Sequence, residues 1–346
     1  MLLNCAKIVI NKFTIFAQYN KVKFQMVINS EATVIKNAGS HFLLSELPLW
    51  KPIPAVLKGK VRLNEGKSTN PIAVGDRVRF SAEVPDGEGL EAVTLENPAL
   101  ISEILDRKNY LIRKSTNLSK QSHIIAANID MAYIVISLYF PEVQLPFVDR
   151  MLLSAGVYGI PAAIIMNKVD LYKDEAEQAI EDFYKIYSSA GYRVIETSTK
   201  TGEGIDEIRK DCNGKVCVFV GESGVGKSSI IKAIDDTLSP KIGKISEAHL
   251  QGKHTTSLYE MYKISTGGYI IDTPGLRGFG LVDLKKEEIA LYFPEMLKYS
   301  EYCRFSPCTH THEPGCAVKE ALEEGKICSE RYNSYLGMLE EDTKFR

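Results

Sequence analysis

The segment Gly221–Ser228 reads GESGVGKS and matches the pattern G-x-x-x-x-G-K-S/T. An apolar run, VCVFV (216–220), comes directly before it, and a helical pattern, SSIIKAIDD (228–236), comes directly after its lysine. A strand, a glycine-rich loop and a helix in this order occur where helices cover a buried parallel sheet. The segment therefore predicts an α/β domain that carries a phosphate-binding loop.

This loop has the chemistry needed to hold a nucleoside triphosphate. Backbone N–H groups of a glycine-rich turn at the start of a helix bind phosphate oxygens. Lys227 would place its charge on the β- and γ-phosphates and so contribute to catalysis, and Ser228 would bind magnesium. The predicted phosphate-loop residues are Gly221, Glu222, Ser223, Gly224, Val225, Gly226, Lys227, Ser228 and Ser229.

Selection of the base is predicted at Asn167-Lys168-Val169-Asp170, which follows the apolar run AAIIM (162–166). The Asp170 carboxylate can accept hydrogen bonds from guanine N1–H and the 2-amino group, whereas adenine lacks this pair of donors. Asn167 would bond near guanine O6 or brace the phosphate loop, and the Lys168 stem would lie over the ring. The segment around Ser198 (TSTK, 197–200) follows another short strand pattern and would offer a backbone N–H to O6.

Two further segments are expected to sense the γ-phosphate. The DTPG segment ends an apolar run; Asp272 would act as an acid behind magnesium, and the Gly275 N–H would bond the γ-phosphate. The loop GKHTTS (252–257) offers a threonine hydroxyl to complete the magnesium shell, and the sequence leaves open whether it is Thr255 or Thr256. Both segments would therefore respond to hydrolysis.

The residue that orients the attacking water is less directly indicated. Leu276 stands where Ras-like GTPases place a glutamine, so water must be positioned otherwise or hydrolysis is slow in the isolated protein. His254 is the nearest catalytic candidate; the alternative is an exposed loop histidine with no catalytic role.

The order of these motifs is unusual. Most GTPases carry the phosphate loop first and NKxD late, whereas here NKVD (167–170) and TSTK (197–200) precede GESGVGKS and DTPG. The sequence therefore predicts a circularly permuted GTPase sheet, which is tolerable because domain termini often lie close together. The chain would then run from the DTPG switch directly into a carboxy-terminal domain.

Before the α/β region, short β-rich runs alternate with turn residues and predict a small barrel of the oligonucleotide-binding (OB) fold. The expected strands are ATVIKN, SHFLL, PAVLKGKVRL, VGDRVRFSAEV and EAVTLE. Seven basic residues against two acidic ones suggest a basic face for RNA, although they can also be a solvated strand face: Lys51, Lys58, Lys60, Arg62, Lys67, Arg77 and Arg79.

Near the carboxyl end, a C-x4-C-x-H-x5-C pattern has the ligand types and spacing of a tetrahedral zinc site. Four protein ligands leave no open position, so the predicted zinc ion is structural. His312 and Cys328 are the competing ligands. The predicted ligands are Cys303, Cys308, His310 and Cys316.

The composition also indicates the cellular compartment and how charge is distributed along the chain. The 7 cysteines are an odd number, which fits a reducing compartment better than a disulfide framework. The net charge of −2 hides a split, because residues 1–114 carry 16 basic and 11 acidic side chains. No stretch approaches a membrane span, so we expect a cytoplasmic protein without a membrane partner. We expect Met26 to be the true start of the chain, with residues 1–26 disordered or mis-assigned.

A barrel, a permuted GTPase and a cysteine–histidine module, in this order, resemble the ribosome small-subunit-dependent GTPase A family. The resemblance runs from about residue 27 to the end and includes GESGVGKSS, NKVD, GKHTTS, DTPG, the four zinc ligands, ANID and the VDR that ends at Arg150. It divides the chain into an RNA-binding OB barrel (27–108), a permuted GTPase domain (109–283) and a mostly helical zinc domain (284–346).

This resemblance implies a monomer that hydrolyses GTP to GDP and phosphate with magnesium and one structural zinc. It also implies stimulation by the small ribosomal subunit, contact with its rRNA and a role in late maturation of that subunit, with the catalytic histidine at His254. Two alternatives stay open. One is a GTP-gated RNA- or ribosome-binding module whose hydrolysis is incidental, as Leu276 suggests; the other is a P-loop kinase or ATPase.

Overall fold

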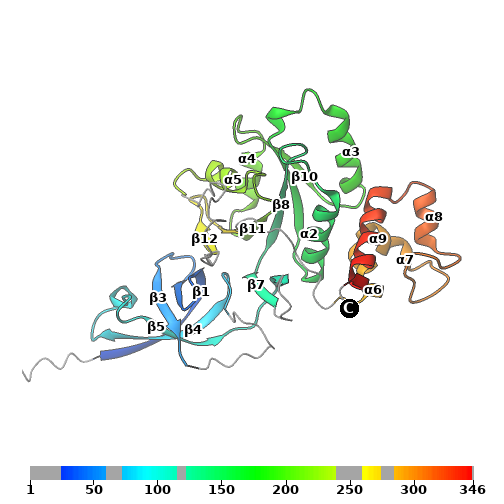
Figure 1. Cartoon of the computed structure of the whole chain (residues 1–346). Coiled ribbons are helices and arrows are strands. Elements are labelled where there is room, and N and C mark those ends of the chain that lie inside the picture. Colours follow the sequence, from blue (N-terminus) through cyan, green and yellow to red (C-terminus); the bar gives the residue numbers. More distant parts are fainter. Residues whose placement is uncertain (1–24, 60–71, 115–121, 239–258, 274–283, 345–346) are drawn as a thin grey trace, which may run out of the picture.

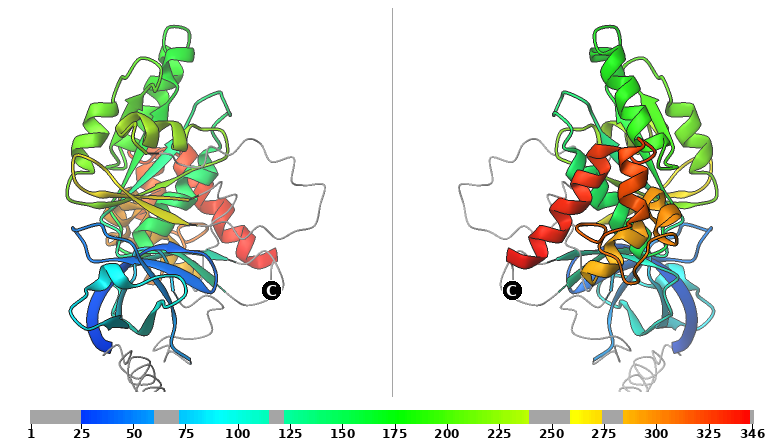
Figure 2. Two further views of the ribbon diagram at one scale, coloured as in Figure 1. Left: turned by 90° about the vertical axis from the view of Figure 1, so that its left-hand side faces the viewer. Right: turned by 90° about the vertical axis from the view of Figure 1, so that its right-hand side faces the viewer.

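The computed structural model describes residues 25–59, 72–114, 122–238, 259–273 and 284–344. Three parts follow one another along the chain: a β-barrel, a sheet covered by helices, and a helical module (Figure 1). Side views show the helical module along one side of the central part, with the barrel below both (Figure 2). The multidomain α/β architecture predicted from the sequence is therefore confirmed.

Five strands form the barrel: β1 (Gln25–Asn37), β2 (His41–Ser45), β3 (Ile53–Leu57), β4 (Arg77–Pro85) and β5 (Ala99–Ile104). They pair in the order β1-β2-β3-β5-β4, and β4 pairs again with β1 to close the barrel. Along β4, buried and exposed side chains alternate, which places Val78, Phe80, Ala82 and Val84 in the barrel core. This alternation of exposed and buried residues is the sequence pattern expected of a strand that turns one face to a core.

One predicted strand of the barrel is wrong. The run EAVTLE (91–96) forms the end of a short 3-10 helix, η1 (Leu90–Ala92), and a loop, and the last strand begins later, at Ala99. In this run Val93 reaches the core, whereas Leu95 is exposed. The Asn97 side chain fixes the loop by donating to Glu83 O at 2.8 Å, and β5 begins directly after Pro98.

The central sheet has the order β10-β9-β8-β11-β13-β12. Its strands are β8 (Met131–Ile136), β9 (Ala162–Asn167), β10 (Val194–Thr197), β11 (Val216–Val220), β12 (Glu260–Lys263) and β13 (Tyr269–Asp272). All neighbours are parallel except β12, which runs antiparallel to β13. The continuous apolar runs of the sequence are these buried strands, as predicted.

Helices cover both faces of the central sheet. The buried side chains of α2 (Leu145–Val157) and α3 (Glu177–Ser188) share one apolar cluster. Those of α4 (Ile205–Asp211) and α5 (Lys227–Ile234) share a cluster on the opposite face. Because β8, β9, β10, β11 and β13 are parallel, their carboxyl ends lie at one edge of the sheet, where ligands bind in sheets of this type.

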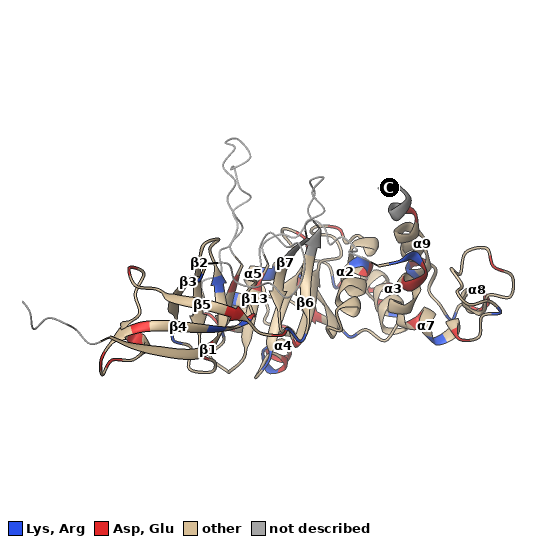
Figure 3. Ribbon diagram, turned by 90° about the horizontal axis from the view of Figure 1, so that it is seen from below, with Lys and Arg blue, Asp and Glu red and all other residues tan. Residues whose placement is uncertain are grey.

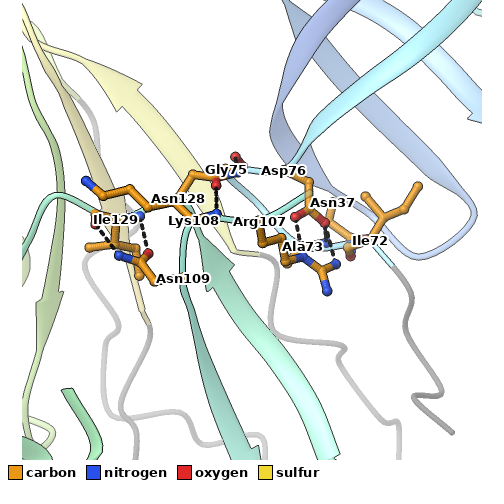
Figure 4. Close-up of polar contacts among 10 residues, drawn as sticks. All are labelled: Asn37, Ile72, Ala73, Gly75, Asp76, Arg107, Lys108, Asn109, Asn128 and Ile129. Atoms are coloured by element: carbon orange, nitrogen blue, oxygen red, sulfur yellow. Dashed lines mark hydrogen bonds and ion pairs between the residues drawn. The ribbon is translucent and has the colours of Figure 1, made fainter. Parts of the chain in front are cut away.

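The barrel is joined to the central part through buried polar groups (Figure 4). Asp76 is fully buried and accepts hydrogen bonds from Arg107 Nε at 2.6 Å and Nη2 at 2.8 Å, and from the Ala73 N–H. Asn128 donates to Gly75 O at 2.9 Å, and a Cβ at Gly75 would meet the Ala127 carbonyl oxygen at 2.1 Å. The hairpin β6 (Tyr110–Lys114) and β7 (Ser122–Ala127) lies at this joint, which is thus a packed contact and not an open linker.

The carboxy-terminal module is helical, as predicted. It contains α6 (Lys286–Ile289), η4 (Ala290–Tyr292), α7 (Pro294–Ser300), α8 (Ala317–Glu323) and α9 (Ser329–Lys344). Its apolar core includes Phe293, Met296 and Tyr335, together with Leu153 from α2. The module is therefore packed on the helix that follows β8 of the central sheet.

Candidate functional site

The phosphate loop occupies the turn between β11 and α5, and α5 begins at Lys227. Gly226 has φ of 100°, and a Cβ there would lie 2.3 Å from Asn167 Nδ2. Only glycine fits this close approach, because a side chain would be strained and would displace the asparagine. The glycine of the motif therefore lets the phosphate loop pack against the predicted base-selecting segment.

Lys227 lies inside this loop with 7% of its surface exposed. Its Nζ donates to Gly221 O at 2.8 Å and to Glu222 O at 2.7 Å. Burial lowers the pKa of Lys227 to about 8, and the nearby Asp272 carboxylate opposes this shift. A phosphate group would offer the buried ammonium a full negative charge in place of neutral carbonyls, which favours binding of a polyphosphate.

The first half of NKVD braces the loop. Asn167 is 1% exposed, donates to Val225 O at 2.8 Å and accepts from Thr197 Oγ1 at 3.0 Å. Lys168 donates from Nζ to Gly224 O at 2.6 Å and to Phe140 O at 2.5 Å. Of the two roles that the sequence allowed Asn167, the structure shows the bracing role, and Lys168 adds a second brace.

The second half of NKVD meets the TSTK segment. Ser198 Oγ donates to Asp170 Oδ1 at 2.6 Å and itself accepts from the backbone N–H groups of Lys200 and Thr201. Ser198 thus holds the carboxylate of Asp170 in place, a role that the sequence did not assign to its side chain. The structure brings together the two segments predicted to read the base.

The acid predicted behind magnesium lies at the end of β13. Asp272 is 8% exposed, and its Oδ1 is buried without a hydrogen-bond partner among the described residues. Burial raises the pKa of this carboxyl, while Lys227 opposes the shift. The next residue, Thr273, donates from Oγ1 to Phe219 O at 2.7 Å and fixes the strand end. An orphaned buried carboxylate oxygen fits a role toward a cation or its bound water.

Four predicted site residues lie outside the described residues: His254, Thr255, Thr256 and Gly275. The adjoining Leu276 lies there too. Their predicted roles in magnesium binding, γ-phosphate contact and water positioning therefore stay predictions.

The cysteine–histidine pattern forms one compact cluster. The ligand atoms of Cys303, Cys308, His310 and Cys316 all lie within 4.8 Å of one another. Burial lowers the pKa of His310, which favours the neutral imidazole that binds metals. The cluster can hold a metal ion. The competing candidates lie outside it, since His312 contacts Thr311 and Cys328 contacts Glu330.

Side chains that the sequence did not indicate fix the position of residues 301–316, the ligand loop that carries the four cluster residues. Tyr332 and Tyr335, on one face of α9, donate from their hydroxyls to the carbonyls of His310 and Thr309, each at 2.6 Å. The Glu313 carboxylate accepts from Thr309 N–H and Oγ1, and these bonds help to hold its pKa at about 2. The YNSY spacing of α9 was the available signal, because residues three apart share a helix face.

The connectivity of the sheet identifies the class of protein. β9, whose last residue Asn167 begins NKVD, precedes the phosphate-loop strand β11 in sequence, yet only β8 lies between them in the sheet. This arrangement is the circular permutation that the motif order predicts. By fold and by the groups at the strand ends, the chain is a circularly permuted P-loop GTPase.

Comparison with known proteins places the chain in a family. The RsgA GTPase family model matches residues 104–282, and the chain belongs to this family of GTP-hydrolysing enzymes. The Small ribosomal subunit biogenesis GTPase RsgA 2 of Bacteroides thetaiotaomicron is 46% identical over 315 residues, which cover 90% of this chain and 98% of the relative. The Small ribosomal subunit biogenesis GTPase RsgA of Bacteroides fragilis is 45% identical with the same coverage.

Solved structures show the same fold. YjeQ from Thermotoga maritima has a TM-score of 0.71 at 31% identity, covering 92% of this chain and all of that one. YloQ, described as a circularly permuted GTPase, has a TM-score of 0.67 at 28% identity, covering 92% of this chain and 96% of that one. Separately, the described part of the chain contains no helix of the length and apolarity needed to cross a membrane.

Proposed function

We propose that this GTPase acts in the late maturation of the small ribosomal subunit and that the subunit stimulates its hydrolysis of GTP. The observation that carries the proposal is the extent of the likeness. The relatives named for small-subunit biogenesis match 90% of the chain, so the likeness extends well beyond the GTPase part alone. A cytoplasmic monomer without a membrane partner completes this proposal.

For the reaction, the phosphate loop residues 221–229 would bind the phosphates, and Asn167, Lys168, Val169 and Asp170 would read guanine. Ser228 and one of the threonines Thr255 and Thr256 would hold magnesium with Asp272 behind it, and the ion would neutralise charge on the β- and γ-phosphates. Lys227 would stabilise the negative charge that develops on the phosphate, and His254 would orient water. The Oδ1 atom of Asp272, which is buried without a hydrogen-bond partner in the part of the chain that the structure describes, supports the magnesium assignment.

We also propose zinc as the metal of the Cys303, Cys308, His310 and Cys316 cluster. Three thiolates and one imidazole are a ligand set that zinc favours over magnesium or calcium. All four positions of a tetrahedron would be filled by protein, so the ion would stabilise the module and have no open site for a substrate.

Contact with rRNA is proposed for the barrel and the zinc module, within proposed domain bounds of 27–108, 109–283 and 284–346. On the barrel, Arg77 and Arg79 form ion pairs with Glu31, and Arg79 also pairs with Glu103. Acidic and basic segments are interspersed on the face seen in Figure 3. Among the described residues of the predicted basic face, the exposed Lys51 and Lys58 are therefore better candidates for phosphate contact.

The proposal is tested by measuring GTP turnover with and without purified small subunits. We expect a higher turnover number with the subunits, and Lys227→Ala should abolish turnover in both conditions because the phosphate charge is no longer met. Large subunits serve as the control. Equal rates with and without small subunits would contradict the stimulation and favour the alternative of a GTP-gated binding module.

Base recognition is tested by Asp170→Asn. The amide presents a donor where guanine also presents donors, so GTP affinity should fall by at least about 100-fold, whereas xanthosine triphosphate, with a carbonyl at C2, should bind better than to wild type. Competition between the two nucleotides measures the change. Asp182→Asn, at an exposed position of α3, is the matched control. Unchanged GTP preference in Asp170→Asn would refute the assignment.

A further inference from the structure

A row of charged side chains runs from the barrel into the nucleotide site. Lys36 of β1 is the register partner of Glu260 in β12, and Glu260 is the register partner of Asp272 in β13. Residues directly opposite each other on neighbouring strands point to the same face of a sheet. The three side chains therefore lie side by side across three strands, although Lys36 and Glu260 are 224 residues apart in sequence.

The charges along this row are ordered. Lys36 Nζ lies 2.9 Å from Glu260 Oε1, and both side chains are about three-quarters buried, with 28% and 26% exposed. At the other end, the charge of Lys227 acts on Asp272, and the charge of Glu260 opposes it. The order is thus positive, negative, negative, positive, with a barrel lysine at one end and the phosphate-loop lysine at the other.

Two like charges directly opposite on neighbouring strands repel each other. Lys36 offsets this repulsion by neutralising Glu260. Without Lys36, the Glu260 carboxylate would lose the cation that neutralises it beside Asp272 and would add negative potential where the phosphates of a nucleotide bind.

We propose that Lys36 is a positioning residue for the nucleotide: its ion pair with Glu260 keeps that carboxylate from weakening the binding of the negatively charged guanine nucleotide. The inference rests on the proposed nucleotide site. A strand of the barrel thereby contributes to nucleotide affinity, and by thermodynamic reciprocity bound nucleotide would stabilise the contact between β1 and β12.

Other contacts attach the barrel at the same edge, so the charge of Lys36 can be tested apart from docking. Trp50 stacks on Tyr269 of β13 with ring centroids 5.6 Å apart. Lys263 of β12 donates from Nζ to Pro48 O at 2.9 Å. We expect these contacts to remain when Lys36 is replaced. Trp50 is the single tryptophan of the chain, so its fluorescence reports whether the barrel stays packed on the sheet.

The experiment measures the dissociation constant of a fluorescent GDP analogue, with magnesium, for the full chain. Lys36→Met should weaken binding by about threefold to tenfold, the effect of one uncompensated charge near the site. Glu260→Gln should tighten binding, and Lys36→Met with Glu260→Gln should return it to within about twofold of wild type. Only a role through the charge of Glu260 gives this pattern of opposite signs and rescue.

Lys263→Met is the matched control, because it removes a lysine of β12 that also links the barrel to the central sheet, through the Pro48 carbonyl and not through a carboxylate. It should leave nucleotide affinity unchanged, and Trp50 emission should match wild type in the Lys36 and Glu260 variants. The proposal is overturned if Lys36→Met has no effect, or if both single variants weaken binding and the double variant is not rescued. If wild type itself showed no magnesium-dependent GDP binding, the proposed nucleotide site would be refuted instead.

Discussion

Removal of the metal from the Cys303, Cys308, His310 and Cys316 cluster is expected to unfold the ligand loop and to loosen the helices packed on it, while the GTPase sheet stays folded. Residues 301–316 contain no helix or strand, so the loop depends on the cluster and on a few side-chain bonds. Structural zinc contributes about 10–16 kcal/mol of apparent binding free energy in small zinc domains. The module has its own apolar core, so part of α9 should remain packed on α2.

Protons compete with the metal in this cluster. Burial raises the pKa of the Cys308 thiol to about 12, so in the absence of metal it stays protonated at neutral pH. Binding of the metal must displace such protons, and the apparent affinity should therefore increase with pH. Metal content by elemental analysis and helix content by circular dichroism, before and after chelation, measure these effects.

Cysteine and histidine substitutions test which residues of the module bind the metal. Cys308→Ser should lose the metal and the folded loop, and should keep GDP binding. Cys328→Ser and His312→Ala, in the same module but outside the cluster, should keep one metal ion per chain. Metal loss in Cys328→Ser equal to that in Cys308→Ser would show that the ligand set is wrong.

Local chemistry explains what the sequence predicts well. The phosphate loop, NKVD and the C-x4-C-x-H-x5-C pattern each place their functional groups within 14 residues or fewer, so spacing alone determines which groups meet. The order of NKVD and GESGVGKS also carries the permutation of the sheet. The strand predicted at 91–96 failed because hydrophobicity alone does not distinguish a loop that buries only Val93 from a strand.

Contacts between distant segments have no such signal. Lys36 and Glu260 meet only because β1 of the barrel adds to the edge of the GTPase sheet. Arg331 meets Asp149 across 182 residues, and one sequence contains nothing that pairs them. The side chains that connect the three parts could be recognised only once the packing was known, whereas the parts themselves could be predicted from periodicity and motifs.

Replacement of Arg331 is expected to destabilise the attachment of the helical module to the GTPase. Arg331 is 1% exposed and lies 2.6 Å from Asp149 Oδ1 of α2 and 2.7 Å from Glu295 Oε1 of α7. Its guanidinium carbon is 4.6 Å from the centre of the Phe293 ring. Arg331→Met leaves two buried carboxylates without their cation, which should lower the free energy of unfolding by about 3–5 kcal/mol. Urea unfolding measures this loss.

The pH dependence and matched variants separate this charge effect from loss of packing. Burial already raises the pKa of Asp149, and loss of Arg331 should raise it further. A carboxyl whose pKa is higher in the folded than in the unfolded state stabilises the fold more as the pH falls. The loss of unfolding free energy in Arg331→Met should therefore be largest at neutral pH and shrink towards about pH 4. Adding Asp149→Asn and Glu295→Gln to Arg331→Met should restore part of the stability. As a control, Arg193→Met breaks a half-exposed pair with Asp211 and should lower the free energy of unfolding by less than about 1 kcal/mol. A loss in Arg331→Met that is constant across this pH range, with no recovery in the triple variant, would mean that Arg331 acts by packing alone.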